Sequence, residues 1–179
     1  MRRKKNGWTL LEMMIAVVVF TLLGLALTML YATGTTLIQV SENKLALQQQ
    51  ARLGLDRVLK ELRLARPGSM TIGAGGNSVT FQIPQSIDPN SGAITWSPVI
   101  TYSVGGINNT QLLRAEGAVT TVICNDINNN AGDPNRLIIT GNQNPNPNLI
   151  TIQMGLRRTT LRGHVAQITL TGQVQTRNP

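Results

Sequence analysis

The 179-residue sequence has few of the side chains that build catalytic and metal centres. It contains one cysteine, Cys124, and one histidine, His164. A single cysteine cannot form an intramolecular disulfide, and we expect Cys124 to be a small buried thiol in a strand. Because His164 has no second His or Cys near it in a segment typical of a strand, the pattern predicts no metal site.

Aromatic and acidic residues are also scarce. Aromatic residues make up 3% of the chain, and no Lys/Arg cluster interleaved with aromatics occurs, so nucleic-acid binding is not expected. Asp88, Glu116, Asp126 and Asp133 are scattered among predicted loops. No Ser/His/Asp arrangement, carboxylate pair or phosphate-binding loop emerges. We therefore predict that the protein is not an enzyme and needs no cofactor.

The positive charge is concentrated at the N-terminus. The net charge is +8, from sixteen basic and eight acidic residues, and residues 2–5 are all Arg or Lys. The rest of the chain has twelve basic against eight acidic residues, so its body is only modestly basic.

A long apolar run follows these basic residues. No charged residue occurs from Met13 to Ser41, and residues 13–32 are mostly aliphatic. About 20 such residues match the hydrocarbon thickness of a bilayer, which predicts a transmembrane helix. The basic residues before it predict a cytoplasmic N-terminus and an exported C-terminal part. A secretory signal peptide cleaved near Gly34 is the alternative, although this apolar run is longer than usual for one.

The residues before the apolar run carry a family resemblance. Gly7-Trp8-Thr9-Leu10-Leu11-Glu12, after a short basic leader, resembles the class III leader of type IV pilins and type II secretion pseudopilins. In that family a prepilin peptidase cuts after the glycine and methylates the new N-terminal amine, and the fifth mature residue is glutamate. The resemblance implies cleavage between Gly7 and Trp8, N-methylation of Trp8, and a special role for Glu12. The family usually has Phe where this chain has Trp8.

The role implied for Glu12 is electrostatic. An ionised residue deep in a membrane helix costs about 2.5 to 3.5 kcal/mol. In a stack of parallel subunits, the N-terminal amine of one subunit can neutralise Glu12 of its neighbour, which turns two costly charges into a pair. The resemblance thus implies that Glu12 favours ordered assembly.

A second helical pattern follows the apolar run. Apolar residues recur at offsets of four, four, three, four and three, which indicates one helix face: Leu47, Ala51, Leu55, Val58, Leu62 and Ala65. We call this set the apolar stripe. Pro67 and Gly68 end the pattern. The sequence predicts one helix from about Trp8 to Arg66, with the apolar stripe packed on a following domain.

That domain is predicted to be an antiparallel β-sheet. Short β-rich runs alternate with Gly, Asn and Pro, and 105–109 is predicted to be a hairpin loop. The candidate strands are Val79–Ile83, Val99–Val104, Gln111–Ala115, Thr120–Cys124, Arg136–Thr140, Leu149–Met154 and Val165–Thr176. The fold class is therefore α+β and pilin-like, with a leader over 1–7, a helix over 8–66 and a periplasmic β domain over 67–179.

Two loops are rich in asparagine. Residues 125–133 contain the opening of a calcium loop, but Ala131 and Leu137 stand where such a loop needs Gly and Glu. A polar surface loop is the favoured interpretation. The second loop, 143–148, has the composition of a turn that carries no chemistry.

The resemblance extends weakly into the body. Residues 51–63, Ile100–Ser103, Leu112–Arg114 and Thr159–Gly163 are similar to the J-type minor pseudopilin and the related W-type minor pilin. This implies a single-pass inner-membrane subunit near the tip of a pseudopilus or type IV pilus, where it primes filament assembly. The implied partners are other minor pseudopilins or pilins, the prepilin peptidase and the inner-membrane assembly platform.

Two alternatives remain open at this point. The chain can be a membrane-anchored module whose β domain binds a glycan or DNA, with the helix as a plain anchor. It can also be a secreted enzyme released by ordinary signal peptidase.

Overall fold

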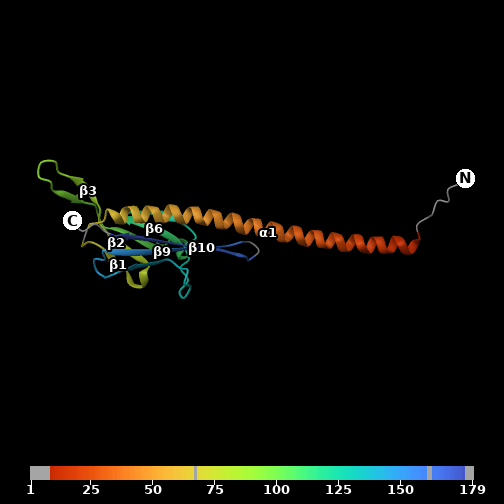
Figure 1. Ribbon diagram of the computed structural model, residues 1–179. Coiled ribbons are helices and arrows are strands. Elements are labelled where there is room, and N and C mark those ends of the chain that lie inside the picture. The colour runs from red at the N-terminus through yellow and green to blue at the C-terminus, as the bar shows by residue number, and fades with distance from the viewer. Residues whose placement is uncertain (1–8, 67, 161–162, 176–179) are drawn as a thin grey trace. The chain divides into compact units, whose positions relative to one another are not determined.

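The computed structural model describes residues 9–66, 68–160 and 163–175. Within these residues one α-helix, α1 (Leu10–Arg63), is followed by ten strands of two to eleven residues (Figure 1). The predicted α+β architecture, a long N-terminal helix and then an antiparallel sheet domain, is confirmed. The helix ends three residues before the predicted Arg66, and the predicted start at Trp8 lies outside the described residues. The chain divides into two compact units, Met1–Ser41 and Glu42–Pro179, which are described separately.

The described part of the first unit is almost entirely helix with exposed apolar side chains. Leu10, Phe20 and Tyr31 are each at least 75% exposed, and large apolar residues between them are also exposed. The threonine hydroxyls of this segment donate hydrogen bonds to backbone carbonyls of the same helix. For example, Thr21 donates to the Val18 carbonyl and Thr28 to that of Leu25, both at 2.8 Å. These hydroxyls therefore keep a hydrogen-bond partner even where the helix is surrounded by apolar groups.

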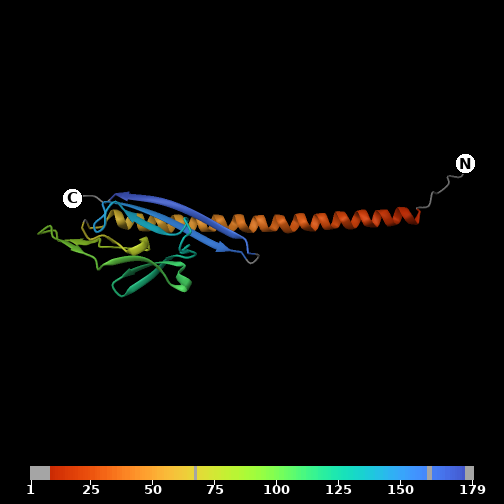
Figure 2. The same ribbon diagram turned by 90° about the horizontal axis from the view of Figure 1, so that it is seen from below.

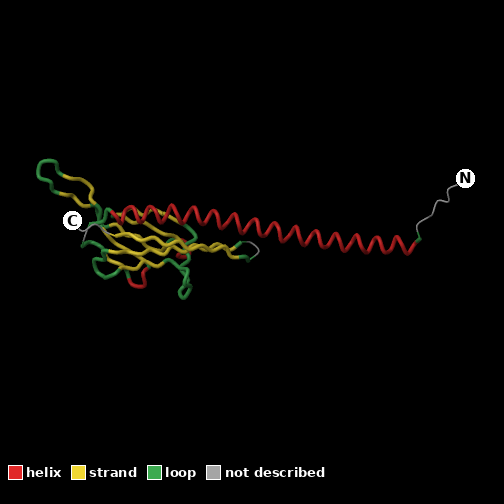
Figure 3. Tube along the Cα trace, viewed as in Figure 1, coloured by secondary structure: helices red, strands yellow, loops and turns green. Residues whose placement is uncertain are grey.

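The second unit contains three antiparallel sheets (Figure 3). The largest has the order β1 (Thr71–Ile72), β2 (Ser78–Phe81), β5 (Ile100–Gly105), β6 (Gln111–Glu116) and β7 (Val119–Cys124). A three-stranded sheet has the order β10 (Val165–Gln175), β9 (Leu149–Thr159) and β8 (Ile138–Gly141). The third sheet pairs β3 (Pro84–Ile87) with β4 (Ile94–Trp96). Two 3₁₀ turns, η1 (Ala74–Gly76) and η2 (Ile107–Asn109), lie between strands.

The apolar stripe forms the helical side of the core. All six of its residues are buried, and they cluster with buried residues from both larger sheets, such as Phe81, Tyr102 and Ile152. The rings of Phe81 and Tyr102 stack with their centroids 6.0 Å apart. The predicted packing of the apolar stripe on the β domain is confirmed.

A glycine allows β10 to lie close to α1. In Figure 2 the two long strands of the C-terminal hairpin run alongside the last turns of α1. A Cβ at Gly172 would lie 2.6 Å from a methyl group of Leu59 and 3.3 Å from Leu55. A larger side chain at this position would require the Leu59 side chain or the strand to shift.

Buried charges also connect the helix to the large sheet. The Arg114 guanidinium contacts a carboxylate oxygen of Glu61 at 2.9 Å and one of Glu116 at 2.7 Å. The side chains of Arg114 and Glu61 are only 13% and 17% exposed. This cluster fixes one face of α1 against β6.

The strand predictions hold for seven of the ten strands, with shifted ends. Strand β9 continues to Thr159, past the predicted Met154, because it pairs along its whole length with β10 up to Val165. Thr176, the predicted end of the last strand, lies outside the described residues. The strands that the sequence did not indicate are β1, β3 and β4. Each has four residues or fewer, and β3 is exposed at every position, so it shows no alternation.

The turn 143–148 has a structural role that its composition did not indicate. The Asn144 side chain accepts a hydrogen bond from the Ile72 N–H at 3.3 Å and donates one to the Ile72 carbonyl at 2.9 Å. The Asn146 N–H donates to the Met70 carbonyl at 2.9 Å. The turn therefore covers β1, an edge strand of the large sheet.

Candidate functional site

Glu12 lies in the first turn of α1 and closes a capping box. Its backbone N–H donates to the Thr9 hydroxyl at 3.3 Å, and its carboxylate accepts from the Thr9 N–H at 3.5 Å. This reciprocal pair satisfies two of the free N–H groups at a helix start. The Thr-x-x-Glu spacing before an apolar run is a recognised sequence signal for it, which the sequence analysis missed. The local geometry thus gives Glu12 a role within its own helix.

The other predicted residues of the leader are not described. Gly7 and Trp8, the expected cleavage and methylation site, lie outside the described residues. The roles assigned to them stay predictions from the sequence.

The helix after Glu12 is long and apolar enough to cross a membrane. Among the described residues, α1 meets that criterion by length and composition, and none of its most apolar window is buried within the structure. A signal sequence near an N-terminus would meet the same criterion. Since contiguous exposed apolar surface marks a membrane or protein contact, this segment needs a partner outside the unit.

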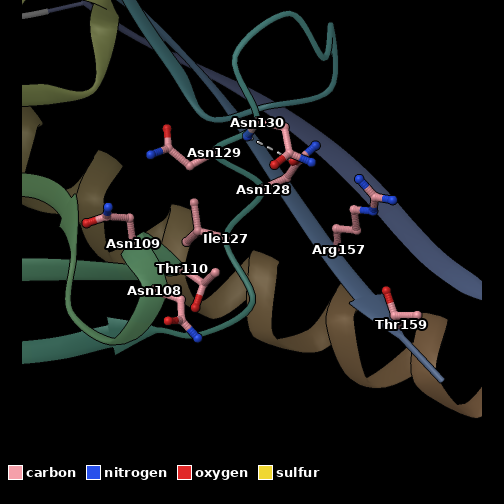
Figure 4. Close-up of a pocket in the computed structure, with 9 residues that line it drawn as sticks. All are labelled: Asn108, Asn109, Thr110, Ile127, Asn128, Asn129, Asn130, Arg157 and Thr159. Carbon is pink, nitrogen blue, oxygen red and sulfur yellow. Dashed lines mark hydrogen bonds between the residues drawn. The ribbon is translucent and has the colours of Figure 1, made fainter. Parts of the chain in front are cut away.

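A second candidate site is a polar pocket in the β domain. Three segments line a cavity of about 360 Å³: residues 108–110 at η2, residues 127–130, and Arg157 with Thr159 on β9. Figure 4 shows the two β9 side chains on one side and Asn108 and Asn109 on the other. Five of the nine lining residues are asparagine and none is acidic. We call this cavity the asparagine pocket.

The 125–133 loop lies mostly at the surface, as predicted, but two of its residues are buried. Ile127 and Asn128 are each 2% exposed, because Ile127 pairs with Leu156 of β9 and joins the core. The Asn128 N–H donates to the Gly155 carbonyl at 2.8 Å. A Cβ at Gly155 would overlap the Asn135 carbonyl, so glycine is needed where this loop crosses the strand.

The two carboxylates of this loop are held by protein groups. Asp126 pairs with the Arg158 guanidinium. Asp133 accepts hydrogen bonds from the Asn128 amide at 2.7 Å and from the Asn135 N–H at 2.8 Å, which lower the pKa of its carboxyl group. Among the described residues, no three His, Cys, Asp or Glu side chains gather where they could hold a metal ion.

The sole cysteine and histidine lie apart from both sites. Cys124 is buried at the end of β7, as predicted, and burial raises the pKa of its thiol to about 12. His164 is exposed and precedes β10 directly, with its backbone N–H bonded to the Thr160 hydroxyl at 3.1 Å. This arrangement offers no nucleophile–base pair from these two residues.

Comparison with known proteins gives a match at the N-terminus. A family model described as the prokaryotic N-terminal methylation motif matches residues 2–28. The match covers the basic leader, Glu12 and the first part of the apolar helix, and none of the β domain. No curated protein and no solved structure matches the chain.

The motif and the fold together support a type IV pilin-like protein. A prepilin-type methylation motif precedes an exposed apolar helix, and an antiparallel sheet domain follows it. Such a motif points to a structural subunit that a prepilin peptidase processes and that assembles with other pilin subunits. The apolar helix is consistent with membrane anchoring.

Proposed function

We propose that the chain is a minor pseudopilin or pilin subunit near the tip of a filament, where it primes assembly. The observation that carries the proposal is the methylation motif directly before an apolar helix that the rest of its unit leaves uncovered. The similarity of residues 51–63, and of short runs in the β domain, to the J-type minor pseudopilin favours the type II secretion system.

The proposed maturation follows from the motif. The prepilin peptidase removes residues 1–7 and methylates Trp8, which becomes the first residue. Residues 13–32 hold the subunit in the inner membrane, with the N-terminus cytoplasmic and the sheet domain, residues 67–179, periplasmic. The assembly platform then moves the subunit into a filament, where its helix packs against those of other minor pseudopilins.

Glu12 has two proposed tasks that substitution can separate. Within the subunit it caps α1, and between subunits its charge pairs with the N-terminal amine of a neighbour. A glutamine at this position keeps an oxygen for the Thr9 N–H but removes the charge. An alanine removes both.

The test measures how much of the full chain enters the filament fraction of its native host. We expect Glu12→Gln and Glu12→Ala to lower incorporation by tenfold or more, with both variants still inserted in the membrane. If Glu12→Gln assembled like the wild type while Glu12→Ala did not, capping alone would explain the residue. If both assembled normally, or if the wild type entered no filament, an anchored binding module would be the better account.

A further inference from the structure

The asparagine pocket has the volume of a small ligand site. Its volume of about 360 Å³ falls in the range of small-molecule and peptide-side-chain sites. The walls come from three segments that are distant in sequence, and Figure 4 shows their side chains around a common space. Nothing in the proposed filament role uses this pocket.

Its walls are held in place by backbone hydrogen bonds. The Ile127 N–H donates to the Thr110 carbonyl and the Arg157 N–H to the Asp126 carbonyl, both at 2.8 Å. The buried Asn128 amide is fixed by Asp133, and its oxygen accepts from the Asn130 N–H at 3.3 Å. A pocket built in this way is formed before any ligand enters, which lowers the entropic cost of binding.

Backbone strain is concentrated at the same place. Four described residues other than glycine have a positive φ, and three of them are Asn108, Asn109 and Asp126. The first two line the asparagine pocket, and Asp126 is adjacent to a lining residue. The left-handed conformation is disfavoured for L-residues, although less so for Asn and Asp than for the others. Such strain collects at ligand-binding loops.

The pocket carries one positive charge, on Arg157, that makes no direct ion pair among the described residues. Arg158 pairs with Asp126 and Arg114 with two glutamates. The Arg157 charge acts on the nearby Asp133 carboxyl group and helps to lower its pKa, but the two make no direct ion pair. Arg157 is also exposed, so a ligand can reach its guanidinium. A guanidinium can bind a carboxylate through two parallel hydrogen bonds.

The other lining groups match peptide chemistry. Apart from that of Asn128, which is bonded within the protein, each asparagine amide of the lining offers a donor and an acceptor, which is the complement of a peptide group. The lining contains no aromatic side chain, so it lacks the apolar platform on which a sugar ring or a base would stack. The arrangement favours an acidic peptide over a saccharide or a nucleic acid.

We propose that the asparagine pocket binds an acidic peptide segment of a partner protein. Arg157 receives an Asp or Glu carboxylate of that segment, and the amides of Asn109 and Asn129 bond to the peptide groups beside it. Since binding needs only the β domain as it stands, the proposal does not depend on filament assembly and can fail independently of it.

The test uses the full chain in detergent micelles, followed by the backbone amide NMR signals. It is titrated with the peptide Gly-Ser-Glu-Gly-Ser, acetylated at its N-terminus and amidated at its C-terminus so that Glu carries the only carboxylate. We expect saturable shifts at residues 108–110 and 127–130. A matched peptide with Gln in place of Glu should bind at least tenfold more weakly, because a charge-assisted hydrogen bond is lost.

The matched variants are Arg157→Gln and Arg63→Gln, which remove one charge each from exposed positions. We expect Arg157→Gln to weaken binding by tenfold or more and Arg63→Gln to leave it unchanged. Absence of shifts at the pocket, or equal binding of the Glu and Gln peptides, would overturn the proposal. Tighter binding of an oligoglucuronate than of the peptide would also overturn it and assign the pocket to an acidic saccharide.

Discussion

The Cys124 thiol lies against the helix, where an ideal Cβ at Gly54 would be 3.4 Å from the Cys124 Cβ. Burial raises the pKa of the thiol from about 9 to about 12, and the charge of Asp126 adds to the effect. Thiolate is the reactive form, so Cys124 is protected twice, by burial and by protonation. We expect it to stay unmodified by a thiol reagent at pH 8 and to react fully once urea unfolds the chain. Rapid modification of the folded protein would show that this packing is wrong.

The same shift makes stability depend on pH in a defined direction. Above pH 9 the thiol of the unfolded chain ionises, whereas that of the folded chain stays protonated until about pH 12. The free energy of unfolding should therefore fall as pH rises from 9 to 12, by up to about 1.4 kcal/mol per unit from this group. The difference between the wild type and Cys124→Ala, measured by urea unfolding at pH 8 and pH 10.5, isolates this contribution. If the free energy of unfolding fell equally between these two pH values in both proteins, the predicted contribution of Cys124 would be contradicted.

Removal of the Arg114 charge would leave Glu61 and Glu116 without their shared ion-pair partner. Without it, the largely buried Glu61 carboxylate would keep only the exposed Arg57, at 3.6 Å, as a charged partner, so we expect Arg114→Ala to lower the free energy of unfolding by about 3 kcal/mol. The matched variant is Arg158→Ala, because its pair with Asp126 is more exposed and should contribute about 1 kcal/mol or less. Denaturant unfolding of the full chain in micelles checks the order. If Arg158→Ala lost more unfolding free energy than Arg114→Ala, the Arg158–Asp126 pair would be the more important of the two for stability.

At the scale of elements, α1 offers a direct comparison between its two faces. Leu62 is fully buried in the apolar stripe, whereas Leu53 is 74% exposed on the same helix. We expect Leu62→Ala to cost about 2 to 5 kcal/mol of unfolding free energy, since it leaves a cavity, and Leu53→Ala less than about 0.5 kcal/mol. Similar losses for both variants, measured by urea unfolding, would mean that the helix is not seated on the sheets by this face.

Elements with strong periodicity could be predicted from the sequence. The stripe from Leu47 to Ala65 follows the helical repeat, and the alternation from Ile100 to Val104 follows that of a strand. Strands β3 and β4 could not be predicted, because they pair only with each other and bury almost nothing. The role of Asn144 in its turn was not predicted either. Its side chain bonds to the Ile72 N–H and carbonyl, where a neighbouring strand would otherwise pair.

The two candidate sites also differ in how far they could be predicted from the sequence. The leader motif is contiguous, so it could be predicted from residue order alone, and the family match over residues 2–28 supports it. The roles of Gly7, Trp8 and Glu12 stay predictions. The asparagine pocket could not, because Asn109, Asn128 and Arg157 meet only through strand register and loop crossing. One signal was present in the sequence, since residues 108–109 and 125–133 each lie next to predicted strands, but nothing there placed them side by side.

At the scale of the whole molecule, the two units have contrasting surfaces. The described helix of the first unit exposes apolar side chains from Leu10 to Ile38, which suits lipid and neighbouring helices. The second unit has its own core and a polar pocket. This contrast is what a subunit needs if it is stored in a membrane and then works in an assembly outside it.

The most direct test of the account is the intact mass and N-terminal peptide of the protein isolated from its native membrane. Processing by a prepilin peptidase predicts loss of residues 1–7 and one added methyl group on Trp8. An intact Met1, or an N-terminus near Gly34 as ordinary signal peptidase would leave, would contradict assembly as a pilin-type subunit.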